Sequence, residues 1–198
     1  PTGTVVEKDA VYRFLKRVPE NVVIVLDEAY CEYLQGPQYA DGVQWLSEFP
    51  NLVVSRTFSK AWGLAGLRMG YGISSPETAD VINRVRQPFN ANALAQAAAT
   101  AVLDDQTYIE RAIEVNQAGL EQLAVGFDRL GLEYIPSAAN FIALDTGRDA
   151  NDGNDALLHE GVIVRPVGAY GMPRHLRVSV GLEHENRRCL QALEKVLG

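Results

Sequence analysis

Short apolar runs alternate with amphipathic stretches along the first half of the chain. Residues 6–17 gather their apolar side chains on one side of a helix and their charges on the other, which predicts a surface helix. Two continuous, β-branched runs, at 22–26 and 52–55, are typical of strands buried on both faces of a parallel sheet. A third strand is expected at 70–74, after a glycine-spaced loop. Strands that alternate with helices in this way predict an α/β domain.

The pattern becomes helical from residue 76, and the second half of the chain then returns to short strands. Amphipathic and alanine-rich stretches predict helices at 76–86, 92–103 and 105–130. Further along, the pattern predicts strands at 132–136, 141–145, 162–165 and 176–180, and helices at 153–160 and 183–197. These elements predict a small α+β domain. We place the boundary near residue 115, so that residues 1–115 hold the α/β part with its linking helices and residues 116–198 the α+β domain.

Composition narrows the class of protein. Eighteen basic against twenty-five acidic residues give a net charge of -7, which argues against nucleic acid as a partner. No apolar run approaches the roughly 20 residues needed to cross a bilayer, so no membrane role is expected. Cys31 and Cys189 lack metal-type spacing and fit the reduced thiols of a cytoplasmic protein. His159, His175 and His184 show no ligand spacing either, and we assign no metal.

The strongest chemical signal is Thr57-Phe58-Ser59-Lys60, followed by a glycine-rich stretch that ends in Arg68-Met69-Gly70. A lysine just after a buried strand, in an apolar setting beside another cation, is favoured as the neutral, nucleophilic amine that imine formation needs. Because Thr57 and Ser59 alternate with Phe58, their hydroxyls can share one face, and Arg68 can add a fork of donors toward the same phosphate. A solvated loop lysine is the ordinary alternative for an isolated Ser-Lys pair, but these neighbours disfavour it.

A second signal is Asp27 with Tyr30, at the carboxyl end of the first predicted strand, where open α/β sheets bind ligands. A carboxylate there can keep a pyridine nitrogen protonated, and the protonated ring is an electron sink. Tyr30 could donate to an oxygen on the same ring. The alternative is that Asp27 caps a following helix and Tyr30 packs against the sheet. The order and distance of this pair before Lys60 favour the functional interpretation.

These segments resemble a known family. VLDEAYCEYL, VVSRTFSKAWGLAGLRMGYG, the opening PTGT and the late HLRVSVG together resemble the C-terminal half of fold-type I aminotransferases, most closely histidinol-phosphate aminotransferases. The resemblance extends along essentially the whole chain. The subfamily rests on RTFSKAWGLAGLR, PFNANALAQAAA and GVIVRPVGAYGMPRHLRVSVG. The resemblance implies that pyridoxal 5'-phosphate (PLP) is the cofactor, and that the chain comprises part of a large PLP-binding domain followed by a small α+β C-terminal domain.

The resemblance also implies residue roles. Lys60 matches the Schiff-base lysine, Asp27 the partner of the pyridine nitrogen and Tyr30 the partner of the ring hydroxyl. The phosphate ligands would be Thr57, Ser59 and Arg68.

Two arginines of the predicted α+β domain are the substrate candidates. Arg177 matches the arginine that binds the substrate α-carboxylate. An arginine in the middle of a strand also needs a bidentate acid to offset its desolvation, which agrees with that role. Arg165 is a candidate for a second acidic group, such as a substrate phosphate, with a solvated strand-end arginine as an equally weighted alternative.

The expected function is therefore transamination between L-histidinol phosphate and 2-oxoglutarate, giving imidazole-acetol phosphate and L-glutamate in histidine biosynthesis, by a protein that is a homodimer when full length. The family's asparagine before Pro-Thr-Gly, its upstream phosphate loop, its ring-stacking aromatic residue and a tyrosine from the dimer partner are not in this sequence. We therefore expect a truncated chain that is inactive alone. An aromatic or broad-specificity aminotransferase, a PLP-dependent decarboxylase, a non-catalytic PLP-binding module and a partner-binding fragment remain alternatives.

Overall fold

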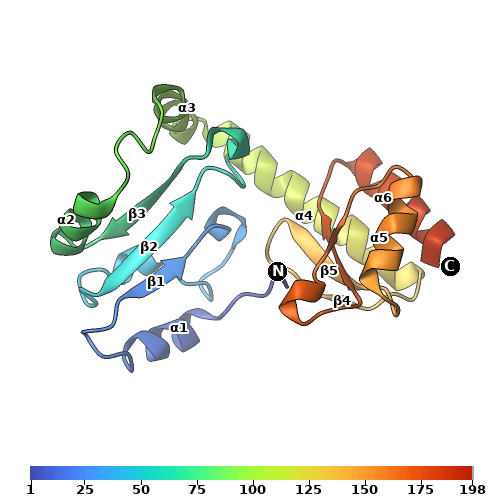
Figure 1. Cartoon of the computed structure of the whole chain (residues 1–198), viewed down its shortest axis with the longest axis horizontal. Coiled ribbons are helices and arrows are strands. Elements are labelled where there is room, and N and C mark those ends of the chain that lie inside the picture. Colours follow the sequence, from blue (N-terminus) through green and yellow to red (C-terminus); the bar gives the residue numbers. More distant parts are fainter. Residues whose placement is uncertain (198) are drawn as a thin grey trace. The chain divides into compact units, whose positions relative to one another are not determined.

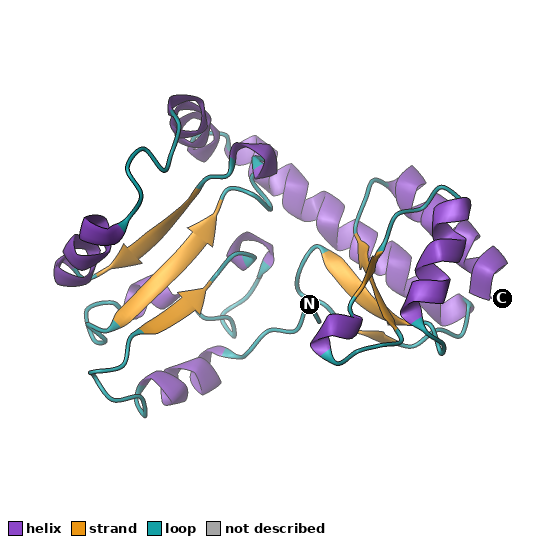
Figure 2. Ribbon diagram, viewed as in Figure 1, coloured by secondary structure: helices purple, strands orange, loops and turns teal. Residues whose placement is uncertain are grey.

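The computed structural model describes residues 1–197, which form two compact units (Figure 1). The N-terminal unit is Val6–Ala112, and the C-terminal unit combines Pro1–Val5 with the chain from Ile113 onward. Each unit has its own sheet and its own helices (Figure 2).

The N-terminal unit is built on a three-stranded sheet of order β1-β2-β3. Strands β1 (Ile24–Asp27) and β2 (Leu52–Thr57) are parallel, and β3 (Gly70–Ser74) runs antiparallel to β2. The helices of this unit are α1 (Lys8–Leu15), α2 (Pro76–Val85), α3 (Ala93–Leu103) and the first turns of α4 (Gln106–Arg129). These elements lie where the hydrophobic pattern predicts them.

At β1, one face of this sheet is covered by other residues and the other face is exposed. Ile24, Leu52 and Val54 pack with Leu15 of α1 and with Trp45 of the 3-10 helix Gly42–Trp45 in one buried cluster. Val25 alternates with them and is 62% exposed. The prediction of a strand buried on both faces is therefore wrong for β1, because the described residues supply packing partners on only one side.

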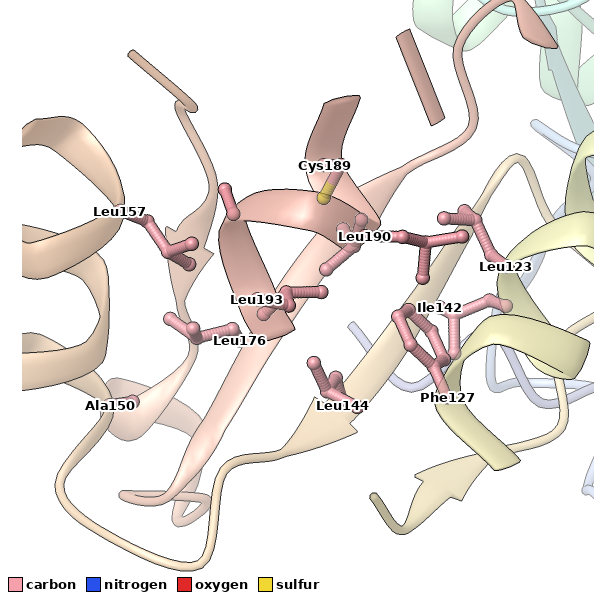
Figure 3. Packing of buried hydrophobic residues seen from close by; sticks show 12 residues of the cluster. Leu123, Phe127, Ile142, Leu144, Ala150, Leu157, Leu176, Cys189, Leu190 and Leu193 are labelled. Carbon is pink, nitrogen blue, oxygen red and sulfur yellow. The ribbon is translucent and has the colours of Figure 1, made fainter. Parts of the chain in front are cut away.

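The C-terminal unit holds an antiparallel sheet of order β4-β5-β7-β6, packed against helices. Its elements are β4 (Tyr134–Ile135), β5 (Phe141–Asp145), α5 (Ala150–His159), β6 (Arg165–Pro166), β7 (His175–Ser179) and α6 (Glu183–Leu197). Figure 3 shows the core, in which leucines of the strands and of α5 and α6 meet Leu123 and Phe127 of α4. Gly126 lets α4 approach α6, since a Cβ there would lie 2.4 Å from a methyl carbon of Leu190.

Local sequence explains where helices begin. Ser75 accepts a hydrogen bond from the Thr78 N–H, and Pro76 occupies the first turn of α2. Asn92 caps α3 in the same way through the Ala95 N–H, at 2.9 Å. Within residues 1–197 no helix is long and apolar enough to span a membrane. The same residues contain no group of three or more His, Cys, Asp or Glu side chains that could hold a metal ion.

Candidate functional site

The parallel strands β1 and β2 bring their carboxyl ends together in the N-terminal unit. Asp27, the last residue of β1, lies opposite Ser55 of β2. One carboxylate oxygen of Asp27, Oδ1, accepts the Ala29 N–H at 3.2 Å and the Ser55 hydroxyl at 3.3 Å. The other oxygen, Oδ2, makes no hydrogen bond within residues 1–197, so it can serve a ligand. Asp27 thus makes a local turn, and because the residue is exposed its second oxygen is accessible.

Lys60 follows β2 in a loop that folds back on itself. The Phe58 N–H donates to the Met69 carbonyl at 3.1 Å, and the Leu64 N–H donates to the Phe58 carbonyl at 2.8 Å. Phe58 is buried, and Lys60 is half-buried two residues later. The Lys60 Nζ lies 5.4 Å from the centre of the Tyr30 ring. The loop therefore brings together the lysine and the tyrosine that the sequence singles out.

The three candidate phosphate ligands lie at the end of β2 and on the loop that follows it, and their surroundings differ. The Thr57 hydroxyl accepts the Ser59 N–H at 3.1 Å and can donate to the Met69 carbonyl at 3.4 Å. Arg68 has a left-handed backbone (φ 55°) and is exposed. Its Nη1 donates to the Ala65 carbonyl at 2.9 Å. The structure therefore brings Thr57 and Ser59 together, whereas the Arg68 guanidinium makes its hydrogen bond within its own turn.

A charged network behind these residues was missed by the sequence analysis. Arg56 donates to Glu28 Oε2 from Nε at 2.9 Å and from Nη2 at 2.7 Å, and Nη2 also lies 2.8 Å from Asp41. The other oxygen of Glu28 accepts the Gly42 N–H at 2.6 Å. Burial opposes the charge on Arg56, but the hydrogen bond to Glu28 more than compensates and raises the pKa of the guanidinium. The network joins the ends of β1 and β2 that carry Asp27 and Thr57.

Cys31 lies beside this network, and its thiol has low reactivity. Burial raises the pKa of the Cys31 thiol to about 12, with a smaller contribution from the charge of Glu32. A thiol in that state is protonated at neutral pH and is a poor nucleophile. Cys189 is buried in the core of the C-terminal unit, and burial raises the pKa of its thiol to about 11.

The C-terminal unit carries a separate pair of arginines. Arg177 in β7 is the direct cross-strand neighbour of Arg165 in β6, so their side chains leave the sheet on one face. The Arg177 guanidinium carbon lies 4.9 Å from the Phe141 ring centre, and the Arg177 Nε is buried without a hydrogen-bond partner within residues 1–197. Arg165 is exposed. Like charges directly opposite each other are unfavourable alone, so this face favours an anion.

Comparison with known proteins gives a consistent grouping. Residues 1–195 match the family described as aminotransferase class I and II. The chain is 59% identical over 197 residues to histidinol-phosphate aminotransferase 2 of Pseudomonas aeruginosa. It is 56% identical over 200 residues to histidinol-phosphate aminotransferase 2 of Ralstonia nicotianae. Both alignments cover all of this chain but 53% and 54% of those relatives, so the chain spans about half the length of the curated relatives it matches.

Solved structures agree with this grouping. The chain superimposes with a TM-score of 0.92 and 34% identity on histidinol-phosphate aminotransferase from Sinorhizobium meliloti, which was crystallised in complex with pyridoxal-5'-phosphate. That likeness covers 100% of this chain and 54% of the other. The histidinol-phosphate aminotransferase of Clostridium acetobutylicum gives a TM-score of 0.91 at 26% identity, over 99% of this chain and 60% of that one.

Proposed function

Because the chain belongs to the class I and II aminotransferase family, we propose that the protein containing it transfers the amino group of L-histidinol phosphate to 2-oxoglutarate with PLP as cofactor. Family membership and the match to solved structures confirm the resemblance and the fold class predicted from the sequence. The substrate is proposed from the names of the relatives, which are 52–59% identical to this chain over its whole length.

The observation that carries the proposal is the approach of the Lys60 amine to the ring of Tyr30, which lies three residues after Asp27 at the carboxyl end of β1. The donor set suits PLP: an amine for its aldehyde, a carboxylate oxygen for its ring nitrogen and a phenol for its ring oxygen. The Lys60 amine lies 5.4 Å from the Tyr30 ring centre, and Asp27 has one oxygen held by the protein and one available. The Thr57 and Ser59 hydroxyls, with Arg68, are the proposed phosphate ligands.

Each residue then has a defined task. When bound, PLP supplies a ring that accepts the electrons released at the substrate Cα. Asp27 holds the proton on the ring nitrogen through its free carboxylate oxygen, while Ala29 and Ser55 fix its other oxygen. The Lys60 amine would hold the cofactor through its aldehyde carbon in the resting protein, and as a free amine it would move the proton at the substrate Cα as general base. Tyr30 donates its phenol hydrogen to the ring oxygen.

Substrate recognition is assigned to the two arginines that face each other across β6 and β7. Arg177 is proposed to bind the α-carboxylate of glutamate, and Arg165 the phosphate of histidinol phosphate. Their shared face and the unpartnered Nε of Arg177 support an acidic ligand. The Arg177 guanidinium also lies over the Phe141 ring, a cation–π contact that helps to hold it in place.

We further propose that residues 1–115 and 116–198 correspond to the large and small domains. The full-length protein is proposed to be a cytoplasmic homodimer, and turnover is proposed to need the half of its relatives' length that this chain does not span.

The test is a transamination assay on the full-length protein with L-histidinol phosphate, phenylalanine and glutamate as amino donors. We expect the largest kcat/KM for histidinol phosphate, and its loss in Lys60→Ala. Larger kcat/KM for phenylalanine would favour the aromatic alternative, and the same turnover by Lys60→Ala would reject the site.

A further inference from the structure

A side-chain hydrogen bond joins the two segments that carry Tyr30 and Lys60. The Trp62 indole N–H donates to Glu32 Oε1 at 2.8 Å, and both side chains are partly buried. Glu32 lies two residues after Tyr30, and Trp62 lies two residues after Lys60. The bond therefore ties the two segments immediately beyond the point where the lysine amine meets the tyrosine ring.

Backbone pairing does not hold these segments together at this point. The last backbone hydrogen bond between them runs from the Glu28 N–H to the Ser55 carbonyl, at 2.9 Å, within the residues that the structure describes. Beyond it, Cys31–Tyr33 forms one turn of 3-10 helix without a side-chain cap, and the Gly63 N–H bonds back to the Lys60 carbonyl. Each segment thus closes on itself, and the side chains of Glu32 and Trp62 bridge them.

The hydrogen bond between Trp62 and Glu32 is better suited to orienting the two segments than to stabilising the fold. Glu32 Oε2 is buried and has no hydrogen-bond partner among the described residues. A carboxylate that is removed from water and receives few donors gains little net stability, because its desolvation offsets the bond it makes. Trp62 also contacts Phe58, with ring centres 6.3 Å apart, so the indole has a ring contact in addition to its hydrogen bond. A partly satisfied bridge next to the candidate site is better explained by geometry than by folding energy.

We propose that Glu32 and Trp62 are positioning residues, whose hydrogen bond holds Tyr30 and Lys60 in register for PLP. The inference rests on the proposed function, because it needs PLP at this site. Neither residue is given a part in bond making or proton transfer. Loosening the bridge lets the two segments separate, which weakens cofactor binding even where the fold is kept.

The experiment measures PLP binding in the full-length protein, by absorbance titration of the cofactor-free form. Trp62→Phe removes the donor and keeps a ring against Phe58, and Glu32→Leu removes the acceptor. Glu32→Gln retains an oxygen acceptor for the indole. Trp45→Phe is the matched control, since it makes the same change at the other tryptophan of the chain, in the cluster beneath β1 and β2. Thermal unfolding with and without PLP separates a loss of stability from a loss of binding.

The proposal makes a specific set of expectations. Trp62→Phe and Glu32→Leu should each raise the PLP dissociation constant about tenfold, because the loosened segments must then be ordered when PLP binds. The double variant should be no worse than either single variant, because both remove the same bond. Glu32→Gln and Trp45→Phe should bind PLP as the wild type does. Without PLP, the unfolding midpoint of Trp62→Phe should fall no further than that of Trp45→Phe.

Two results would overturn the inference while leaving the proposed function intact. One is an unchanged dissociation constant in Trp62→Phe, and the other is a double variant whose loss is the product of the two single losses. If the wild-type protein itself fails to bind PLP, the proposed function fails, and the inference fails with it.

Discussion

Replacing Arg56 by leucine should leave the buried carboxylate of Glu28 without its ion-pair partner and destabilise the N-terminal unit. Glu28 is 8% exposed, and Arg56 gives it two hydrogen bonds, at 2.9 and 2.7 Å. Among the described residues, only the Gly42 N–H would remain as a donor to that carboxylate. Hydrogen bonds to a charged group contribute about 1.5–3 kcal/mol each, and removing one partner of a buried ion pair costs about 3–5 kcal/mol. Since the Arg56 side chain is 22% exposed, we expect a loss of about 3 kcal/mol in the free energy of unfolding.

The assay is urea unfolding of the cofactor-free protein. Asp41→Asn is the matched control, because the Asp41 side chain is 45% exposed and its contact with Arg56 should contribute at most about 1 kcal/mol. Adding Glu28→Gln to Arg56→Leu should recover about 1 kcal/mol or more of the free energy of unfolding, since a buried amide without partners is less costly than a buried charge without partners. A loss below about 1 kcal/mol in Arg56→Leu, or no recovery in the double variant, would refute the account of this network.

Three further predictions concern chemistry, specificity and pH. Asp27→Asn in the full-length protein should keep the fold but slow the proton-transfer step about a hundredfold or more in single-turnover kinetics; unchanged kinetics would reject its role. Arg165→Ala should lower kcat/KM for histidinol phosphate about tenfold or more and spare phenylalanine, while Arg177→Ala should affect glutamate most; equal losses for all donors would leave Arg165 structural. Although burial opposes it, hydrogen bonds from the Gly147 N–H and from Arg174 hold the pKa of Asp145 below its ordinary value. A carboxylate whose pKa is lowered in the folded protein stabilises the fold only while it is ionised. The free energy of unfolding should therefore fall as the pH drops below about 4, and Asp145→Asn should reduce this pH dependence in unfolding titrations.

The order of helices and strands could be predicted from the sequence because hydrophobic periodicity determines it. The strands at 70–74 and 141–145 and the helix ending at Leu197 follow their apolar patterns closely. The apolar run of β1 led to a wrong prediction, namely that both faces of the strand are buried. A continuous apolar run shows that a strand can be buried on both faces, but it does not show which other residues cover them. Val25 is the example, with 62% exposure.

In the candidate site, too, one part could be predicted from the sequence and another could not. Lys60 and Asp27 could be singled out because Asp27 ends one strand and Lys60 comes shortly after another, and parallel strands bring such positions to one edge of a sheet. The bonds that support them could not be predicted. Nothing in the local pattern pairs Trp62 with Glu32, which are 30 residues apart, or Arg56 with Glu28, which are 28 residues apart. The opposition of Arg165 and Arg177 depends on the β6–β7 register, which only the folded sheet reveals.

The most direct test of the central claim is the chemical identity of the residue that holds PLP. Borohydride reduction of the full-length protein in the presence of PLP, followed by peptide mapping, should place the pyridoxyl label on Lys60, beside Tyr30 and at the end of β2. Lys60→Arg should remove the label and keep the fold. A label on any other lysine, or an undiminished label in the Lys60 variant, would contradict the account.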